Sequence, residues 1–301
     1  MDFAVELPLV WVIFGPTASG KTGAGIEVAE FLGGEVVNAD SRQVYSKISI
    51  IAAAPNEAET ARVPHHLFEF VDPAERMSAQ RWSDMCSAKI DEIVARGKVP
   101  VVVGGTGLYL RTLMEGLSDI PDVPIAVELE YSDMPLEERY AHLQEVDPVL
   151  AAKLHPSDTQ RITRGLVVYT HTGVPLSEWQ AMPPKAPPYR FMKLAISPDR
   201  ELLYSRIETR WGQMVEAGVV DEVRALKDAG YTLDMPGLQG LGIAEIYDYL
   251  DGNLSWDETA RQAVQGTRHY AKRQVTWLRN TYKAEHTFET AGELVAFVKG
   301  L

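Results

Sequence analysis

The chain is poor in cysteine, with Cys86 alone among 301 residues. A single thiol cannot form an internal disulfide, so a disulfide-stapled secreted scaffold is excluded and a reducing cytoplasm is the expected compartment. No apolar run approaches the length of a membrane span. Asp2 and Glu6 precede the first apolar run, so we expect neither a signal peptide nor a membrane partner.

The chain also lacks positive charge, with 29 Lys and Arg against 42 Asp and Glu and a net charge of −13 at pH 7. Neutralised phosphates supply most non-specific affinity for nucleic acid, so the negative net charge argues against indiscriminate binding. One stretch is an exception, because no acid lies between Arg261 and Glu285. Its cations are Arg268, Lys272, Arg273, Arg279 and Lys283. A local basic groove is therefore compatible with the acidic total.

The first pattern that carries chemistry is a glycine-rich loop. A predicted strand at residues 9–14 leads into GPTASGKT at 15–22, and a helical pattern follows, with its apolar positions at Ala24, Val28, Phe31 and Leu32. This is the order of a phosphate-binding P-loop. Glycines let several N–H groups converge on one anion, and the helix start adds its positive dipole end. We predict a di- or triphosphate site made of Gly15, Thr17, Ala18, Ser19, Gly20, Lys21 and Thr22, with Thr22 able to hold Mg²⁺.

Two signatures of NTP-driven enzymes are missing. A predicted buried strand at 99–103 is followed by Gly104 and Gly105, where kinases and hydrolases commonly place an acid that helps to hold magnesium. The asparagine-lysine-x-aspartate signature of guanine-nucleotide switches is also absent. The sequence therefore favours phosphate binding without ordinary NTP chemistry.

The order of strands and helices predicts a doubly wound α/β sheet. Strand patterns at 36–38, 99–103 and 191–196 alternate with helical patterns at 78–96 and 199–217. After Gly116, prolines indicate a linker over 119–134, two helical patterns follow, and a stiff proline-rich exit lies at 183–188. We predict an α/β core of residues 1–120 and 191–301, interrupted by a small helical domain at 121–190.

Several residues leave alternatives open. Asp40 follows a predicted strand, so its carboxylate either faces the P-loop crevice or forms a turn. Arg206 and Arg210 lie one helical turn apart and serve either solvent or a phosphate. The adjacent His65 and His66 have no third ligand at metal-binding spacing, and we expect them to order a loop.

The same ambiguity applies to residues that could face RNA. Gln160, Arg161 and Arg164 share one helix surface, which spacing alone assigns to solvent. Tyr270 and Trp277 lie in the acid-free stretch and either pack in the core or contact RNA.

Taken together, six motifs resemble those of bacterial tRNA dimethylallyltransferases, in the order found in that family. They are GPTASGKT (15–22), DSRQVY (40–45), PHH (64–66), GGTGLY (104–109), HPSD with the following QR (155–161), and TRHYAKRQVTWLR (267–279). The resemblance covers nearly the whole chain. The segment 49–55, SIIAAAP, departs from the family's usual acid, threonine and lysine.

The resemblance implies transfer of a dimethylallyl group from dimethylallyl diphosphate to N6 of adenosine 37, beside the tRNA anticodon. It implies a P-loop NTPase-like parallel sheet with an inserted helical domain that grips the anticodon stem-loop. Mg²⁺ on Thr22 is the implied cofactor, and we expect a monomer. Asp40 would be the general base, Thr17 would contact the bridging oxygen, and Arg210 would join Lys21 on the diphosphate.

The resemblance also implies the RNA contacts. Asp40, Ser41, Arg42, Gln43 and Thr106 would surround the target base. The anticodon loop and backbone would meet Gln160, Arg161, Ile162, Thr163, Arg164, Gln239, Arg268, Lys272, Arg273 and Arg279. The alternatives are a small-molecule P-loop kinase, an adenylate prenyltransferase making free cytokinins, and a non-catalytic RNA-binding module.

Overall fold

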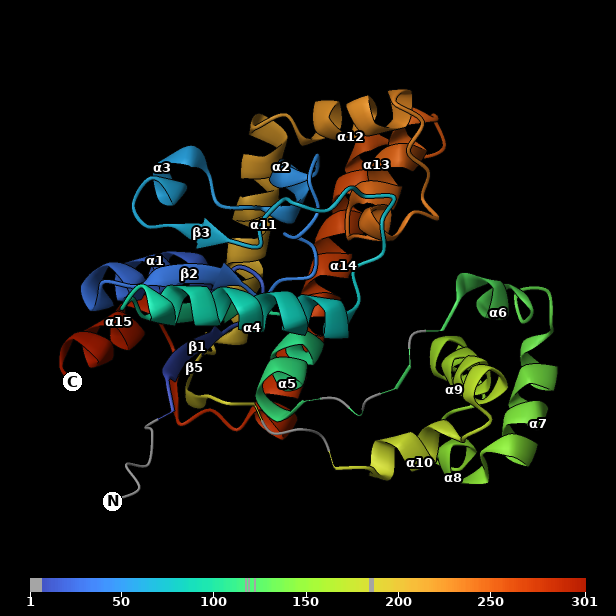
Figure 1. The fold of residues 1–301 in the computed structure, drawn as a ribbon. Helices are drawn as coiled ribbons and strands as arrows, with labels where there is room; N and C mark the ends of the chain where they lie inside the picture. Colours follow the sequence, from blue (N-terminus) through green and yellow to red (C-terminus); the bar gives the residue numbers. More distant parts are fainter. Residues whose placement is uncertain (1–6, 117, 119, 122, 184–186) are drawn as a thin grey trace, which may run out of the picture. The chain divides into compact units, whose positions relative to one another are not determined.

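The computed structural model describes residues 7–116, 118, 120–121, 123–183 and 187–301. The chain forms two compact units: one comprises the residues up to Met114 and from Pro188 onward, and the other is Glu115–Pro187. The insert predicted at 121–190 begins and ends a few residues later than this second unit. Figure 1 shows both units along the chain.

The first unit is built on a six-stranded sheet in which every paired neighbour is parallel, in the order β3-β2-β4-β1-β5-β6. The strands are β1 (Leu9–Phe14), β2 (Glu35–Asn38), β3 (His65–His66), β4 (Pro100–Gly104), β5 (Arg190–Ile196) and β6 (His286–Phe288). The predicted α/β fold with a parallel sheet is confirmed.

Helices surround this sheet. They are α1 (Lys21–Leu32), α2 (Ser49–Ala52), α3 (Glu57–Thr60), α4 (Ala79–Ala95), α5 (Gly107–Glu115), α11 (Arg200–Glu216), α12 (Val219–Asp228), α13 (Ile243–Leu250), α14 (Trp256–Trp277) and α15 (Ala291–Lys299). A 3₁₀ turn lies at Pro236–Leu238, and a π-helical turn at Leu278–Tyr282 follows α14. Among the residues described, no helix is both long and apolar enough to cross a bilayer.

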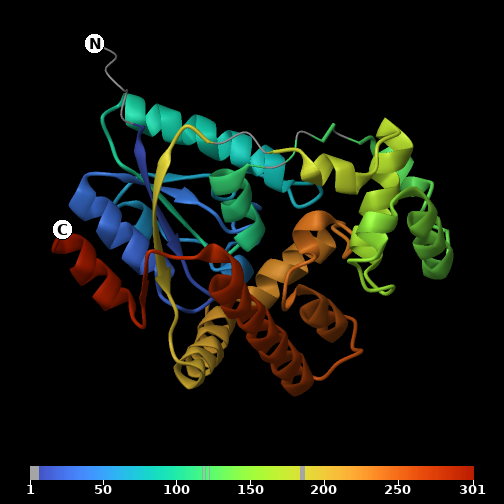
Figure 2. The ribbon, with the colours of Figure 1, turned by 90° about the horizontal axis from the view of Figure 1, so that it is seen from below.

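Each face of the sheet has its own core, because successive side chains of a strand point to opposite faces. Val10, Val12 and Phe14 of β1 pack with α4 and α5, whereas Trp11 and Ile13 pack with α1 and α15. Figure 2 shows α4 on one face of the sheet and α1 with α15 on the other.

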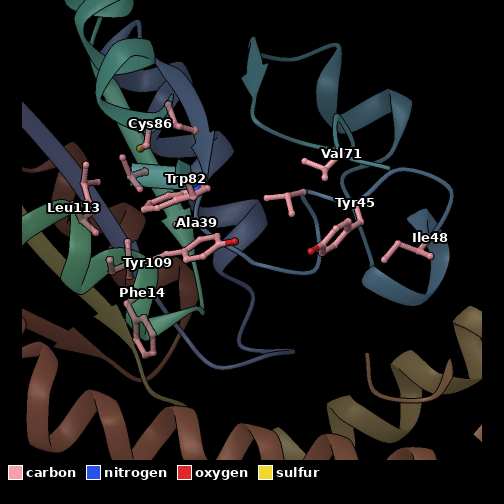
Figure 3. Close-up of a cluster of buried hydrophobic side chains, with 14 of the residues drawn as sticks. Phe14, Ala39, Tyr45, Ile48, Val71, Trp82, Cys86, Tyr109 and Leu113 are labelled. Carbon is pink, nitrogen blue, oxygen red and sulfur yellow. The ribbon is translucent and has the colours of Figure 1, made fainter. Parts of the chain in front are cut away.

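The centre of the larger core is aromatic. Trp82 is fully buried and stacks on the Tyr109 ring, with centroids 4.4 Å apart (Figure 3). The Trp82 indole N–H donates to the Asn38 carbonyl at 2.9 Å. This contact fixes the carboxyl end of β2, the strand that leads to Asp40.

The second unit is a small helical module. Its helices are α6 (Ile125–Leu129), α7 (Leu136–Val146), α8 (Pro148–Ala151), α9 (Thr159–Thr172) and α10 (Leu176–Ala181). They bury a separate core that includes Leu143, Ile162 and Leu166. Gly165 has no room for a side chain, because a Cβ there would lie 2.8 Å from atoms of Leu143 and Leu150.

Several local predictions need correction. The segment 119–134 is not simply a linker: it contains α6, and Tyr131 is buried with its hydroxyl 2.6 Å from Thr170 Oγ1. His65 and His66, which we expect to order a loop, lie in the short edge strand β3, with His65 Nδ1 2.8 Å from the Val63 carbonyl oxygen and His66 Nε2 2.6 Å from Glu35 Oε2. The proline-rich exit lies partly outside the described residues, at 184–186.

Phe31 does not belong to the buried face of α1, since it is 52% exposed. The helix packs against both β4 and α15, so its buried arc is wide and centred near Gly25 and Ala29. Phe31 lies at the margin of that arc. The spacing of apolar residues alone therefore wrongly predicted that Phe31 lies on the buried face of α1.

Candidate active site

The P-loop, residues 15–22, connects β1 to α1 and is held in a strained, compact conformation. Ala18 has a φ of 61° and Gly20 a φ of 91°, both in the left-handed region. A Cβ at Gly15 would lie 2.4 Å from the Ser19 hydroxyl. The loop therefore folds back on itself as a phosphate cradle requires.

Lys21 is the first residue of α1 and is 7% exposed. Burial lowers its pKa to about 8, although the neighbouring Asp40 carboxylate acts in the opposite direction. A buried ammonium gains strongly from an anion that enters beside it. This cation is therefore prepared for a charged ligand.

Helix α11 supplies two guanidinium groups to the loop. Arg210 Nη1 donates to Thr17 Oγ1 at 3.2 Å, and Arg206 Nη1 contacts the Ser19 carbonyl oxygen at 3.4 Å. Burial lowers the pKa of Arg210, an effect that Asp40 opposes. Both arginines therefore contact the P-loop, and their donation to a bound phosphate stays a prediction.

Asp40 lies just beyond β2 in a hydrogen-bonded turn. Its N–H donates to Asn38 Oδ1 at 2.8 Å, and its own Oδ1 accepts the Arg42 N–H at 2.9 Å. Next to it, the Ser41 N–H donates to Thr106 Oγ1 at 2.8 Å. Asp40 therefore forms a turn, as one of the two alternatives proposed, and its carboxylate also lines the cavity described next.

A cavity of about 370 Å³ in the first unit is lined by Thr17, Arg210 and Asp40. Its polar lining includes Thr17, Asp40, Ser41, Arg42, Arg210, Gln239, Tyr270 and Arg273. Its apolar lining includes Ile48, Ile51, Ile207, Trp211, Met214, Ile243 and Val264, which sequence reasoning did not assign to the site. The structure therefore places the P-loop threonine and the carboxylate on one cavity with an apolar wall.

Three residues predicted to surround a base hold the loops of the site together. The Arg42 guanidinium donates to the carbonyls of Pro236 and Gly237 and lies over the Tyr45 ring. Gln43 is buried and donates to the Ala53 carbonyl at 2.7 Å. Thr106 is bonded to Ser41. Of the three, Arg42 lines the cavity.

The basic stretch lies on α14 and the turn that follows it. Lys272 and Arg273 line a shallow groove along α14, and Arg279 is exposed. Arg268 pairs with Glu208 of α11 and lies over the Tyr204 ring. The two aromatic residues of this stretch have different surroundings. Tyr270 lines the cavity, while Trp277 packs in the core against Phe14 with ring centroids 5.0 Å apart.

Helix α9 of the second unit carries the other predicted RNA contacts. Gln160, Arg161 and Arg164 are exposed, and Arg161 pairs with Asp158 at 3.4 Å. Thr163 accepts a hydrogen bond from Arg139 at 3.1 Å. Ile162 is fully buried in the core of this unit, so its side chain has no surface to offer an RNA.

The oxygen donors at the P-loop suit a hard cation. Thr22, the second residue of α1, is partly exposed, and the buried Ser19 hydroxyl has no hydrogen-bond partner. Mg²⁺ prefers oxygen ligands and commonly combines few protein groups with phosphates. The described residues hold no cluster of three or more His, Cys, Asp or Glu side chains that would bind a metal alone. A site here would thus depend on the phosphates of a ligand.

Residues 43–281 match the family model described as IPP transferase. This chain belongs to the IPP transferase family. A relative from Parvibaculum lavamentivorans named tRNA dimethylallyltransferase is 42% identical over 96% of each chain. One of the same name from Rhodospirillum centenum is 44% identical over 93% of this chain and 91% of its own.

Solved structures agree with this family. A tRNA isopentenylpyrophosphate transferase from Bacillus halodurans matches with a TM-score of 0.72 and 33% identity, covering 98% of this chain and 96% of its own. A eukaryotic dimethylallyltransferase described as acting on tRNA matches with a TM-score of 0.83 and 30% identity, covering 94% of this chain and 74% of its own. The sheet is that of a P-loop NTPase-like fold.

Proposed function

We propose that this protein transfers a dimethylallyl group from dimethylallyl diphosphate to N6 of adenosine 37 in tRNA, releasing diphosphate. The observation that carries this proposal is one cavity lined by both Thr17 and Asp40, with Arg210 bonded to Thr17. We name Thr17 and Arg210, which line the cavity, together with the neighbouring P-loop residues 18–22 and Arg206, the donor end. Asp40–Arg42 with Gln239 and Gly240 form the acceptor end.

The reaction forms one C–N bond and breaks one C–O bond. The adenine amino group is a weak nucleophile, because its lone pair is delocalised into the ring. As N6 attacks the first carbon of the dimethylallyl group, the Asp40 carboxylate accepts its proton. The diphosphate leaves with the electron pair of the C–O bond.

The donor end stabilises the charge that develops on the diphosphate. Lys21 and Arg210 supply positive charge in a partly desolvated site, where electrostatic stabilisation is stronger than in water. The Thr17 hydroxyl, which accepts a hydrogen bond from Arg210, would contact the bridging oxygen. Thr22 would hold Mg²⁺ together with phosphate oxygens, and the ion when bound would neutralise part of the diphosphate charge.

The apolar lining suits the five-carbon group. Ile51, Ile207, Trp211 and Met214 offer hydrocarbon surface next to Thr17 and Asp40. Such a wall excludes water from the carbon under attack and disfavours hydrolysis of the donor. The pairing of an anion cradle with an apolar wall favours a prenyl diphosphate over ATP as the ligand.

RNA recognition would use the single-strand mode, in which the target base leaves its stack and enters the acceptor end. Lys272, Arg273 and Arg279 would contact backbone phosphates, and Gln160, Arg161, Thr163 and Arg164 of α9 would contact the anticodon loop. We propose that the enzyme acts as a monomer. The reduced Cys86 fits a cytoplasmic site of action.

The test is turnover with defined substrates. Purified protein with dimethylallyl diphosphate and an anticodon stem-loop should give N6-(dimethylallyl)adenosine and diphosphate, detected by mass spectrometry of nucleosides. Incubation with AMP and with ATP alone separates the alternatives. Product on AMP without RNA would favour an adenylate prenyltransferase, and phosphoryl transfer from ATP would favour a kinase. Membership of the IPP transferase family does not favour the adenylate prenyltransferase or the kinase.

A further inference from the structure

One buried side chain links the two ends of the cavity from outside it. Gln274 lies on α14 and is 5% exposed. Its Oε1 accepts the N–H of Thr17 at 2.9 Å, and its Nε2 donates to the carbonyl of Gly105 at 2.8 Å. One carboxamide therefore bridges the P-loop and the β4–α5 loop.

The orientation of this carboxamide is fixed by its partners. A backbone N–H can only donate and a backbone carbonyl can only accept, so a single orientation of the amide satisfies both. Both partners are main-chain groups, which no substitution at positions 17 or 105 would remove except Thr17→Pro. The bridge therefore depends on the chemistry of Gln274 alone.

The surrounding packing leaves Gln274 little freedom. A Cβ at Gly105 would lie 2.4 Å from Gln274 Nε2, and a Cβ at Gly107 would lie 2.5 Å from the Trp277 ring. Gln274 and Trp277 are three residues apart and so share one face of α14. The glycines of the β4–α5 loop thus allow this face to rest directly on the main chain.

Each end of the bridge leads to a reacting group. At the donor end, Thr17 presents its hydroxyl to Arg210 while Gln274 holds its N–H. At the acceptor end, the residue after Gly105 is Thr106, which holds the N–H of Ser41 beside Asp40. The chain of contacts from Gln274 therefore reaches both the diphosphate contact and the turn of the base.

We propose that Gln274 is a positioning residue that sets the distance between the leaving diphosphate and the carboxylate that accepts the N6 proton. The proposal rests on the proposed function. Small errors in the placement of reacting groups lower the rate of the chemical step. Removing the bridge should therefore reduce kcat while each substrate, bound alone, keeps most of its affinity.

The experiment compares Gln274→Ala, Gln274→Met and Gln274→Glu with the wild type on dimethylallyl diphosphate and an anticodon stem-loop. For Gln274→Ala and Gln274→Met we expect kcat to fall about 10- to 100-fold, with KM for the donor and Kd for RNA within about threefold of the wild type. Gln274→Met keeps the volume, so it separates the lost hydrogen bonds from a cavity. Gln262→Ala, on the same helix and bonded to Glu258, is the matched control and should keep wild-type kinetics.

Gln274→Glu supplies a readout that a purely structural role would not change. When protonated, the new carboxyl can accept from Thr17 and donate to Gly105, as the amide does. When ionised, the carboxylate has no proton to donate to the Gly105 carbonyl, so that hydrogen bond is lost. We expect kcat of this variant to fall with rising pH through an ionisation that the wild type and Gln274→Ala do not show.

Three outcomes would overturn the proposal and leave the proposed function intact. The first is a wild-type kcat in Gln274→Met, and the second is a raised KM with unchanged kcat in Gln274→Ala or Gln274→Met. The third is a pH dependence of kcat in Gln274→Glu that parallels that of the wild type. Loss of folding in Gln274→Ala would leave Gln274→Met and Gln274→Glu to decide. Absence of prenyl transfer by the wild type would instead refute the proposed function.

Discussion

The donor end and the acceptor end of the cavity are constructed differently. At the donor end, Ser19 and Lys21 are buried, the Ser19 N–H donates to the Pro16 carbonyl within the loop, and Gln274 and Arg206 hold the loop from other helices. At the acceptor end, Asp40, Ser41 and Arg42 are partly exposed and are held by side-chain hydrogen bonds from Asn38 and Thr106. A small anion can be bound by a preformed cradle, whereas a base carried on an RNA needs an accessible edge.

This contrast predicts that substitutions at the two ends change different kinetic constants. Substitutions at the donor end should alter donor binding and leaving-group stabilisation together, because the same cations serve both. Substitutions at the acceptor end should alter the chemical step and the placement of the target base, and leave donor binding unchanged.

The largest effect is expected for Asp40→Asn, which retains the oxygen that accepts the Arg42 N–H but cannot accept the N6 proton. Loss of a positioned general base costs about 10²–10⁴-fold in rate. We expect kcat to fall by that amount while donor affinity, measured by calorimetry, stays unchanged. Near-normal turnover would remove Asp40 from the role of base.

Arg210→Ala tests the donor end. Removing one preorganised charge-stabilising group costs about 10²–10³-fold, and here we expect both a lower kcat and weaker donor binding. Arg206→Ala is the comparison on the same helix, since Arg206 reaches only a carbonyl at 3.4 Å. Its effect should stay within about tenfold. Equal losses in the two variants would contradict a specific role for the Arg210–Thr17 contact.

The sequence predicted the donor end better than the acceptor end, and the reason is distance along the chain. The P-loop is a contiguous strand, loop and helix, so its residues could be read locally. Arg210 bonds to Thr17 across 193 positions and remained an alternative. Gln274, 257 positions from Thr17, carried no role of its own before the fold was known. Its only signal was its place in a motif of cations and aromatics.

The acceptor end shows a second limit. The resemblance implies that Arg42 and Gln43 surround the base. In the structure their side chains donate to the carbonyls of Gly237 and Ala53, and Arg42 also lines the cavity. Ile162 was included with its neighbours on α9, although its position on the helix turns it into the core. β6 and α15 were not predicted, since a three-residue strand gives little periodic signal.

The third prediction uses the pKa of Lys21, about 8. An anion binds the protonated form, so the donor KM should rise about tenfold between about pH 7 and pH 9. Lys21→Arg stays charged throughout this range and should show no such rise. In the protein without donor, the free energy of unfolding should rise with pH between about 8 and 10.5. In this range Lys21 of the folded chain has lost its proton, whereas Lys21 of the unfolded chain still holds it. A matching KM rise in Lys21→Arg would refute the assignment.

The smallest effects are expected for the cations of α14, which extend the contrast to RNA. Lys272 is exposed in the groove, whereas Arg268 is already paired with Glu208. A phosphate contact contributes about 0.7–0.9 to the slope of log affinity against log salt. Lys272→Ala should therefore lower the slope by about that amount, and Arg268→Ala by less, in titrations of the stem-loop from about 50 to 200 mM salt.

Glu208→Gln sharpens this last comparison, because it frees the Arg268 guanidinium without removing it. If the pair with Glu208 restrains Arg268, this variant should bind RNA more tightly and with a steeper salt slope than the wild type. Arg268→Ala in the Glu208→Gln background should then cancel the gain. A slope that falls equally in Lys272→Ala and Arg268→Ala would mean that Arg268 exchanges its acidic partner for a phosphate when RNA binds.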